Sequence, residues 1–332
     1  MYRSALASHA VSLCLSIPGG LLLSGLVGCA REAPGAAGTA AAQEGYPRLI
    51  ELPSGARMLV TSEPRRIVPA NAGALDLLTE LVGPDRLAAL PRQALDYSVL
   101  AERGASERAA WDALPRFERY LAEPLLAGRA DLVVSDPWGA LETTQRLREV
   151  GVNVLELPDV SCMADVEANL RLLGRALDLE PRAETVIAAW RRRADALRAR
   201  GAGRGQRALA YSYYGSQGAC AGSGSTLAEV FALCGLANAA GHLHGHASMS
   251  FEDLLALDPD WIVVAHRGEG EGEGGTIALL RSEPVLAQLA AVRGQRIVEL
   301  PQRLFASNSQ QLLEAAELLS ERLERARAAR RE

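Results

Sequence analysis

The sequence predicts an α/β protein built from two similar lobes, because one helix-then-strand pattern occurs twice. The first copy runs from Glu123 to Val134 and the second from Glu252 to Val264. Each copy starts with a glutamate at an expected helix start and continues through Leu-Leu-Ala. An aspartate follows eight residues after the glutamate and precedes a run rich in Val or Ile. A repeat of this kind indicates two lobes, and ligands commonly bind between two lobes.

The composition is that of a globular protein and excludes several functions. A chain of 332 residues is long enough for two domains, and its charged content of 23% is ordinary. The net charge of -5, with arginines scattered along the chain, gives no clustered basic face for nucleic acid. The sequence contains no lysine. Schiff-base chemistry and a Walker-type phosphate lysine are therefore excluded.

Residues 1–29 predict a lipoprotein signal peptide. Arg3 precedes an apolar run that is too short to span a bilayer and is broken by Pro18. The ending Leu26-Val-Gly-Cys29 resembles the bacterial lipobox, which implies lipidation of Cys29. An ordinary secretory signal with an incidental cysteine is the alternative. Residues 30–45, rich in Ala, Gly and Thr, predict a flexible tether.

Three cysteines remain after the signal segment is removed. They are Cys162, Cys220 and Cys234, an odd number without Cys-x-x-Cys spacing. A bridge between Cys220 and Cys234 is awkward, because the helix expected between them would hold their Cα atoms beyond the ~7 Å limit of a disulfide. We expect buried free thiols.

The expected first lobe covers residues 46–160 and alternates strands with helices. Turn residues at Pro53 to Gly55 predict a hairpin, and Gly83-Pro84 ends the first helix. Alternation of strands and helices favours a parallel sheet. The expected elements are a hairpin at 48–61, strands at 66–69, 131–135 and 152–157, and helices at 74–82 and 143–150.

Residues 161–203 are helical in pattern, with a break expected near Pro181. A helix of ~20 residues would span roughly 30 Å, enough to cross from one lobe to another. The pattern alone is equally compatible with a helical hairpin on the surface.

The expected second lobe covers residues 204–332. Thr226 and Glu229 predict a capping box for a helix that Gly235 ends, and Ser250 with Asp253 predicts another helix start. The remaining expectations are strands at 208–212, 261–265 and 296–300, a glycine-rich segment at 215–224, a mobile loop at 268–275 and a helix at 309–330.

Several segments together resemble the substrate-binding proteins of ABC importers for ferric siderophores, haem and cobalamin. The resemblance covers nearly all of residues 64–325 and implies the class III periplasmic-binding fold: two Rossmann-like lobes with parallel-rich sheets, joined by one long interlobe helix. It implies a binding protein without catalytic residues. The matching segments are Pro64 to Val68, Leu78 to Arg86, Glu123 to Val134, Asn169 to Gly174, Gly222 to Thr226, Cys234 to Asn238, Ser250 to Val264 and Ala291 to Val298.

In this family, one exposed glutamate on each lobe pairs with arginines of the permease, and the matching residues are Glu123 and Glu252. Separated surface carboxylates can register a basic partner through complementary charge. The alternative is that each glutamate only favours the positive end of its own helix.

The carboxyl ends of the expected strands nominate the residues of a ligand cleft. Aromatic faces there suit a flat or bulky chelate, although partial burial in a lobe core is the alternative for them. The guanidinium of Arg303 could face an anionic chelate, or could simply be solvated. The nominated residues are Asn71, Asp136, Trp138, Tyr213, Tyr214, His266 and Arg303.

Three histidines, His242, His244 and His246, alternate with other residues. In an extended segment they would share one face, so His244 or its neighbours could supply an axial ligand to haem iron or bind a transition metal. Solvated loop histidines are the alternative. Because the first lobe has no histidine after the signal, a chelated metal is favoured over a bare ion.

These observations predict a monomeric, lipid-anchored extracytoplasmic protein that binds an iron complex, either a ferric siderophore or haem, or cobalamin. It would deliver this ligand to an ABC permease dimer with its ATPase subunits, and it would have no catalytic cofactor. The alternatives are a transition-metal-ion carrier that uses the histidines, a secreted metallohydrolase, and a sensor or adhesion lipoprotein. No His-Glu-x-x-His or Gly-x-Ser-x-Gly motif supports a hydrolase.

Overall fold

The repeated sequence pattern forms the same structural unit in both lobes. The computed structural model describes residues 45–137, 139–215, 217–266 and 275–329. In the first lobe, Asp131 precedes β6 and accepts hydrogen bonds from the backbone N–H groups of Arg65 and Arg66, at 2.8 and 3.0 Å. In the second, Asp260 precedes β12 and accepts from the N–H of Arg207 at 2.8 Å. Each repeated aspartate thus fastens its strand to the start of the neighbouring parallel strand.

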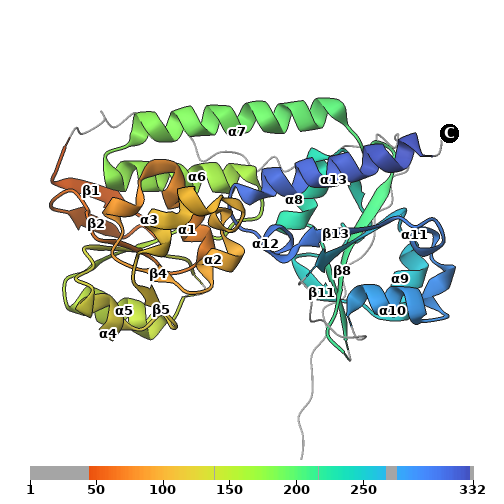
Figure 1. The fold of residues 1–332 in the computed structure, drawn as a ribbon, viewed down its shortest axis with the longest axis horizontal. Helices are drawn as coiled ribbons and strands as arrows, with labels where there is room; N and C mark the ends of the chain where they lie inside the picture. The colour runs from red at the N-terminus through yellow and green to blue at the C-terminus, as the bar shows by residue number, and fades with distance from the viewer. Residues whose placement is uncertain (1–44, 138, 216, 267–274, 330–332) are drawn as a thin grey trace, which may run out of the picture. The chain divides into compact units, whose positions relative to one another are not determined.

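The first lobe contains a three-stranded parallel sheet in the order β3-β6-β7 (Figure 1). A second parallel pair, β4-β5, and an antiparallel hairpin, β1-β2, complete it. The bounds are β1 Arg48–Glu51, β2 Arg57–Val60, β3 Ile67–Pro69, α1 Ala72–Leu81, η1 Pro84–Arg86, β4 Leu90–Pro91, α2 Ala94–Tyr97, η2 Val99–Glu102, α3 Ala105–Asp112, β5 Arg116–Phe117, α4 Ala122–Ala127, β6 Leu132–Ser135, α5 Leu141–Glu149 and β7 Asn153–Glu156.

The second lobe is built on a mixed sheet in the order β11-β9-β8-β12-β13, with β10 also paired to β8. Strands β8, β12 and β13 are parallel, whereas β9 and β11 are antiparallel to their neighbours. The bounds are β8 Arg207–Tyr213, β9 Gly218–Ala221, α8 Thr226–Leu233, β10 Ala237–Asn238, β11 His246–Ser248, α9 Phe251–Leu257, β12 Trp261–His266, α10 Thr276–Ser282, η3 Leu286–Gln288, α11 Ala290–Arg293, β13 Ile297–Pro301, α12 Gln302–Phe305 and α13 Gln311–Ala328.

One long helix bridges the lobes. Residues 161–203 form α6 (Met163–Leu177) and α7 (Glu180–Arg200), separated by Asp178 and Leu179, so the break expected near Pro181 is present. The 21 residues of α7 contact α1 and α6 of the first lobe and α8 and α13 of the second (Figure 1). Of the two alternatives for this segment, the crossing between lobes is the one found.

Helix starts in the second lobe follow local capping rules, with one correction. Ser250 and Asp253 form the expected capping box at the start of α9. At α8 the cap is Ser225 rather than Thr226, and its Oγ accepts from the N–H of Ala228 at 3.2 Å. The prediction was one residue late because either hydroxyl satisfies the cap pattern. Glu229 faces Arg198 at 3.5 Å instead.

The beginning of α13 is seated on the first lobe through a buried carboxylate. Asp76 of α1 is 1% exposed and accepts from the N–H of Val99 at 2.8 Å. From the second lobe, Ser309 Oγ and Gln311 Nε2 both donate to its Oδ2 at 2.6 Å. Gln310 donates to the backbone carbonyl of Asp76 at 2.8 Å. Residues 309–311 therefore tie the second lobe to the first independently of α7.

A neighbouring arginine strengthens this junction. Arg303 of α12 is 7% exposed and donates to Glu314 of α13 at 2.5 Å, to Gln311 Oε1 at 2.7 Å and to Glu102 of the first lobe at 3.3 Å. Because Arg303 joins Glu102 to α13, the ion pairs and the Asp76 bonds form one connected network. We call residues 303–311 the interlobe strap.

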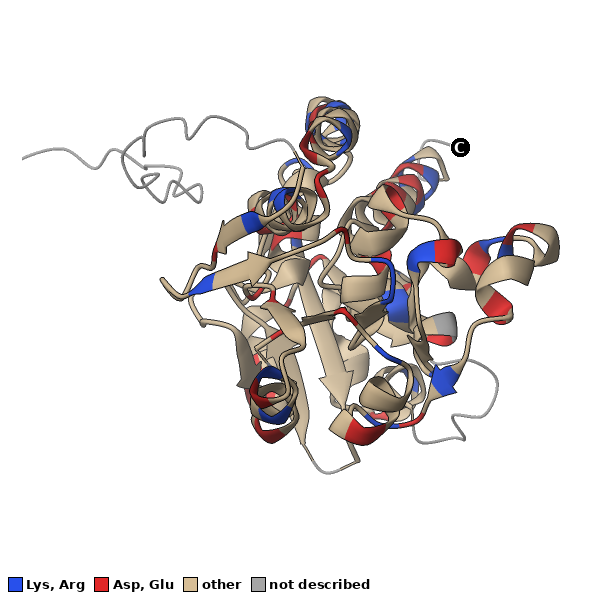
Figure 2. Ribbon diagram, turned by 90° about the vertical axis from the view of Figure 1, so that its left-hand side faces the viewer, with Lys and Arg blue, Asp and Glu red and all other residues tan. Residues whose placement is uncertain are grey.

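Figure 2 shows the distribution of charge along the backbone from one side. In this view, acidic and basic residues both occur on the helices. Within the described ranges, no helix has both the length and the apolar character to cross a membrane. The three cysteines after residue 44 are free thiols. Cys220 and Cys234 are buried as expected, whereas Cys162 is only half-buried.

Asp76 makes stability depend on pH. Burial raises its pKa from the ordinary 3.8 to about 7, against the opposing effects of Ser309, Val99, Gln311 and Arg303. When the pKa of a carboxyl is higher in the folded than in the unfolded protein, the group stabilises the fold fully at pH values below its unfolded-state pKa. This stabilisation is lost as pH rises through the folded-state pKa. We expect the wild-type free energy of unfolding to lose up to about 4 kcal/mol from this group between about pH 4 and pH 8.

Urea unfolding at several pH values measures this effect. Asp76→Asn is uncharged throughout, so its stability should decline less than that of the wild type over the same range. Exposed Glu142 provides the matched control Glu142→Gln, which should follow the wild type. Parallel curves for the wild type and Asp76→Asn would contradict the assignment.

Candidate functional site

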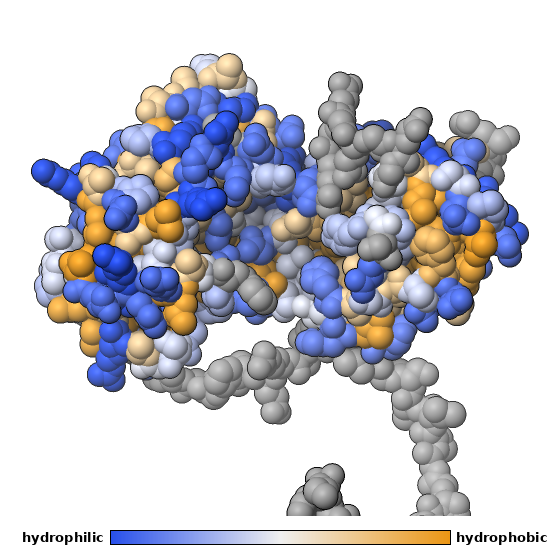
Figure 3. Space-filling view, turned by 90° about the horizontal axis from the view of Figure 1, so that it is seen from below, coloured by the Kyte–Doolittle hydropathy of each residue, from blue (hydrophilic) through white to orange (hydrophobic). Residues whose placement is uncertain are grey.

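A cavity of about 820 Å³ lies between the two lobes. Seen from below, the surface between the lobes is hollowed (Figure 3). Strand ends of the first lobe, the glycine-rich loop of the second lobe and the interlobe strap form its walls. Its described lining includes two carboxylates and two imidazoles but no guanidinium.

Close backbone pairing positions the histidines of the second lobe. Residues 222–223 pair with residues 243–245 through Gly222 N–H to Gly245 O at 2.7 Å and Ser223 N–H to Leu243 O at 2.8 Å. Gly224 has φ +72°, and a Cβ there would lie 2.8 Å from the His244 ring. The glycine therefore allows His244 to rest against the loop backbone. This loop positions the ring beside the cavity.

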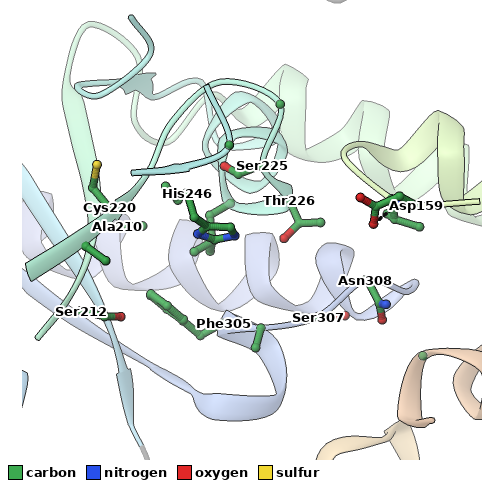
Figure 4. A pocket seen from close by; sticks show the side chains of 18 of the residues that line it. Asp159, Ala210, Ser212, Cys220, Ser225, Thr226, His246, Phe305, Ser307 and Asn308 are labelled. Carbon is green, nitrogen blue, oxygen red and sulfur yellow. Dashed lines mark hydrogen bonds between the residues drawn. The ribbon is translucent and has the colours of Figure 1, made fainter. Parts of the chain in front are cut away.

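His246 starts β11 opposite Ala221 of β9 and also lines the cavity. Figure 4 shows it projecting into the cavity, with Phe305 of α12 lying on an adjacent wall and Asp159 and Asn308 on the far side. An imidazole and an aromatic ring that line the same cavity suit a ligand that carries a metal and a flat apolar surface.

The first lobe contributes polar side chains at the carboxyl ends of its strands. Asn71 follows β3 and caps α1, since its Oδ1 accepts from Ala74 N–H at 2.9 Å. Its Nδ2 donates to Asp136 Oδ2, after β6, at 2.5 Å. Asp159 follows β7 at the same edge of the sheet. Asn71 thus orients the Asp136 carboxylate at the cavity wall.

The interlobe strap forms the floor. Phe305, Ser307 and Asn308 line the cavity. Asn308 lies directly against the first lobe, because a Cβ on Gly73 would come within 2.1 Å of its Oδ1. Only glycine at position 73 permits this approach. A side cavity of about 280 Å³ continues behind this contact, next to Asp76 and Arg303.

The structure brings four nominated residues together: Asn71, Asp136, Tyr214 and His244 all line the main cavity. Tyr213 does not. Consecutive residues of a strand point to opposite faces, and the Tyr213 ring packs against Phe251 with 5.9 Å between centroids. Trp138 lies outside the described residues.

His266 and Arg303 are placed elsewhere. His266 ends β12 as expected, but its Nδ1 lies 3.1 Å from Glu299 Oε2 of β13, and it borders a separate groove with Trp261. Of the main and side cavities, Arg303 borders the side cavity and is not among the described residues that line the main one. The N–H groups of its guanidinium donate to Glu314, Gln311 and Glu102. The expectation that the guanidinium faces an anionic chelate is therefore wrong.

The three histidines do not share one face. His242 lies in a turn and borders a different depression from His244 and His246. Gly245, at φ +64°, interrupts the extended backbone that the alternation assumed. The described part of the chain contains no group of three or more His, Cys, Asp or Glu residues placed to hold a metal ion.

Sequence reasoning missed several lining residues. Asp159 could have been found, because it follows a strand end by the rule that gave Asp136. Ser307 and Asn308 carry no local motif, and only the seating of the strap places them at the cavity. Cys220 also lines it, and burial raises the pKa of this thiol, which disfavours the reactive thiolate.

The two repeated glutamates are exposed in the first turns of α4 and α9. Figure 1 shows α4 at the bottom of the first lobe and α9 just above α10 on the second lobe. Glu123 and Glu252 are therefore available to an external partner, one from each lobe.

Comparison with known proteins identifies the family. The family model described as periplasmic binding protein matches residues 74–304. Comparison with curated protein sequences gives no match. A solved structure described as an ABC-type Fe3+-hydroxamate transport system from Saccharomonospora viridis DSM 43017 has a TM-score of 0.68 and 22% identity, covering 83% of this chain and 99% of that chain.

Two haem-binding structures are also similar. The periplasmic heme-binding protein RhuT from Roseiflexus sp. RS-1 has a TM-score of 0.67 and 24% identity, covering 79% of this chain and 98% of that chain. A periplasmic heme-binding protein from Pseudomonas aeruginosa has a TM-score of 0.65 and 26% identity, covering 77% of this chain and 91% of that chain. The predicted class III periplasmic-binding fold is confirmed. The prediction that the chain is a binding protein rather than an enzyme is also confirmed. With the family model matching more than half of its residues, the chain belongs to the periplasmic binding protein family.

Proposed function

We propose that this protein captures an iron complex, either haem or a ferric hydroxamate siderophore, and delivers it to the permease of an ABC importer. The observation that carries the proposal is the interlobe cavity of about 820 Å³, lined by two imidazoles and two aromatic residues. Sites that bury a whole organic ligand have volumes of roughly 300 to 1,000 Å³. Similarity to structures described as haem-binding and Fe3+-hydroxamate transport proteins supports this ligand class.

Among iron complexes, the side chains favour haem. A neutral imidazole nitrogen is a common axial ligand of haem iron, and His244 and His246 both border the cavity. Tyr214 and Phe305 offer aromatic faces for a flat macrocycle. Since the described lining contains no arginine, the haem carboxylates would be solvated by water at the open mouth or would accept hydrogen bonds from hydroxyl and amide groups of the lining. Cobalamin and a bare transition metal are alternative outcomes of the test below.

Native mass spectrometry and absorption spectroscopy test the ligand. Residues 44–332, which form one compact unit, are incubated separately with haem, cobalamin, a ferric trihydroxamate and zinc. We expect a mass increment of intact haem and a shifted Soret band. Alanine at both His244 and His246 should weaken binding at least about tenfold, or ~1.4 kcal/mol.

His242→Ala is the matched control, because His242 borders a different depression. It should bind haem as the wild type does. Retention of the trihydroxamate alone, with no effect of the histidine changes, would replace haem by a siderophore. Retention of bare zinc would instead establish a metal-ion carrier, and binding of none of the four would defeat the proposal.

We further propose that Glu123 and Glu252 dock the protein on the permease. Both lie at helix starts, where the dipole stabilises their charge, and complementary charge steers and registers partners. Changing both to alanine should abolish uptake of the ligand by reconstituted importer while leaving ligand affinity unchanged. Glu142→Ala removes another exposed first-turn glutamate and should leave uptake intact. Normal uptake by the double variant would eliminate this docking role.

Lipidation of Cys29 is proposed on the Leu26-Val-Gly-Cys29 pattern, which lies outside the described residues. A lipid on Cys29 with a tether to residue 45 would hold the binding unit at a membrane surface. Expression with radiolabelled palmitate should label the full-length wild type and not Cys29→Ser, and only the wild type should sediment with membranes. Equal release of both proteins into the soluble fraction would show an ordinary secretory signal.

A further inference from the structure

A chain of three hydrogen-bonded side chains joins a buried carboxylate of the first lobe to the wall of the cavity. Ser309 Oγ lies 2.6 Å from Asp76 Oδ2, and Ser307 Oγ lies 3.1 Å from Ser309 Oγ. Asp76 and Ser309 are fully buried, whereas Ser307 is 6% exposed and lines the ligand cavity. The chain thus begins in the interlobe junction and ends where a ligand would bind.

The other bonds of these atoms limit the ways in which the hydroxyl protons of the chain can be placed. Val99 N–H and Gln311 Nε2 donate to the Asp76 carboxylate. Ser309 Oγ accepts from Gln311 N–H at 3.4 Å, and Ser307 Oγ accepts from Ser309 N–H at 3.2 Å. Each hydroxyl therefore has one further lone pair and one proton to place.

The ionisation of Asp76 decides where these protons lie. An ionised carboxylate only accepts, so Ser309 donates to Asp76 and Ser307 donates to Ser309. Ser307 then offers the cavity an oxygen lone pair. A protonated Asp76 can donate to Ser309, which then donates to Ser307, and the Ser307 proton is free to point into the cavity. No heavy atom has to move between the two arrangements.

We propose that Asp76, acting through Ser309, determines whether Ser307 presents a hydrogen-bond donor or an acceptor to the ligand. Asp76 is a positioning residue in this scheme and Ser307 the residue that contacts the ligand. The inference rests on the proposed function, since it assumes that the cavity holds the transported chelate. It deepens that function by making the retention of ligands that carry acceptor oxygens dependent on pH.

Asp76 titrates in the useful range, because burial raises its pKa to about 7. Its surroundings contain charge of both signs. The charged groups that face it or its hydrogen-bond partners are Glu80 of α1, Glu102 of η2, Arg303 of α12 and Glu314 of α13. Burial also raises the pKa of Glu80, which accepts from Gln310 at 3.2 Å, so Glu80 is the neighbour that needs a control.

The sign of the effect follows from linkage. Asp76 binds its proton more tightly when the interlobe strap is packed on it than when the strap is detached and Asp76 is hydrated. Rising pH therefore shifts the equilibrium toward the detached strap. Rising pH also withdraws the Ser307 donor from the ligand. Both effects act in one direction for a chelate with carboxylate or hydroxamate oxygens. Its affinity should fall as pH rises through about 7, by roughly three- to tenfold for one hydrogen bond.

The test is a set of titrations of the full chain with haem and, separately, with a ferric trihydroxamate, at about pH 6 and pH 8. The wild type should show the loss of affinity at the higher pH. Ser307→Ala, Ser309→Ala and Asp76→Asn each interrupt the chain at a different point, so each should lose this component of the pH dependence. Glu80→Gln should retain it. The histidines are present in all variants, so their own titration cancels in the ratio of wild-type to variant affinity.

A ratio of wild-type to Ser307→Ala affinity that is the same at both pH values would overturn the inference. If Asp76→Asn does not fold, the two serine variants still decide the question. If the wild type binds neither chelate, the proposed function has failed on its own. Infrared difference spectra across the same pH range then remain informative. The inference predicts a protonated carboxyl band that titrates near neutral pH and is absent in Asp76→Asn, and ionisation of Asp76 throughout would refute it.

Discussion

The arrangement of the binding unit depends on one buried carboxylate of the first lobe being satisfied by donors of the second. An ionisable group that is 1% exposed is tolerated only with hydrogen-bond partners. Ser309 and Gln311 supply two of them, and their positions set the start of α13. Helix α7 also crosses between the lobes, but a single helix mainly fixes the distance between the two lobes. The Asp76 contacts fix the register of the lobes, and with it the floor of the cavity.

The sequence could predict the features that arise from local chemistry. The repeated aspartates are an example, because Asp131 and Asp260 each precede a strand and fasten it to a neighbour by backbone hydrogen bonds. A rule about strand ends likewise nominated Asn71 and Asp136, which meet at 2.5 Å. In both cases the governing interaction involves one side chain and a strand terminus, and its residue types are visible in the sequence.

The sequence could not predict positions that are decided by tertiary partners. The guanidinium of Arg303 suggested a ligand, yet it pairs with Glu314 of the same lobe and with Glu102 of the first lobe. The pairing with Glu102 forms only after the lobes have assembled. Tyr213 and Tyr214 are adjacent and equally aromatic, and a shift of one residue in the strand decides which of them faces the cavity. Ser307 and Asn308 belong to no motif. Their role comes from the seating of the strap on Asp76 and from the absence of a side chain at Gly73.

The two walls of the cavity differ in chemistry, and this difference bears on how a ligand would sit. Asp136 and Asp159 belong to the first lobe, and His244 and His246 to the second. Imidazoles suit a metal centre, whereas carboxylates suit hydrogen-bond donors of an organic scaffold. A chelate that satisfies both walls has to bridge the lobes. Because the interlobe strap already fixes the spacing of the two lobes, such a ligand contacts both walls without a large closing motion. Binding then costs little conformational entropy of the protein. The size of the bound chelate is then selected by the spacing that the Asp76 junction sets.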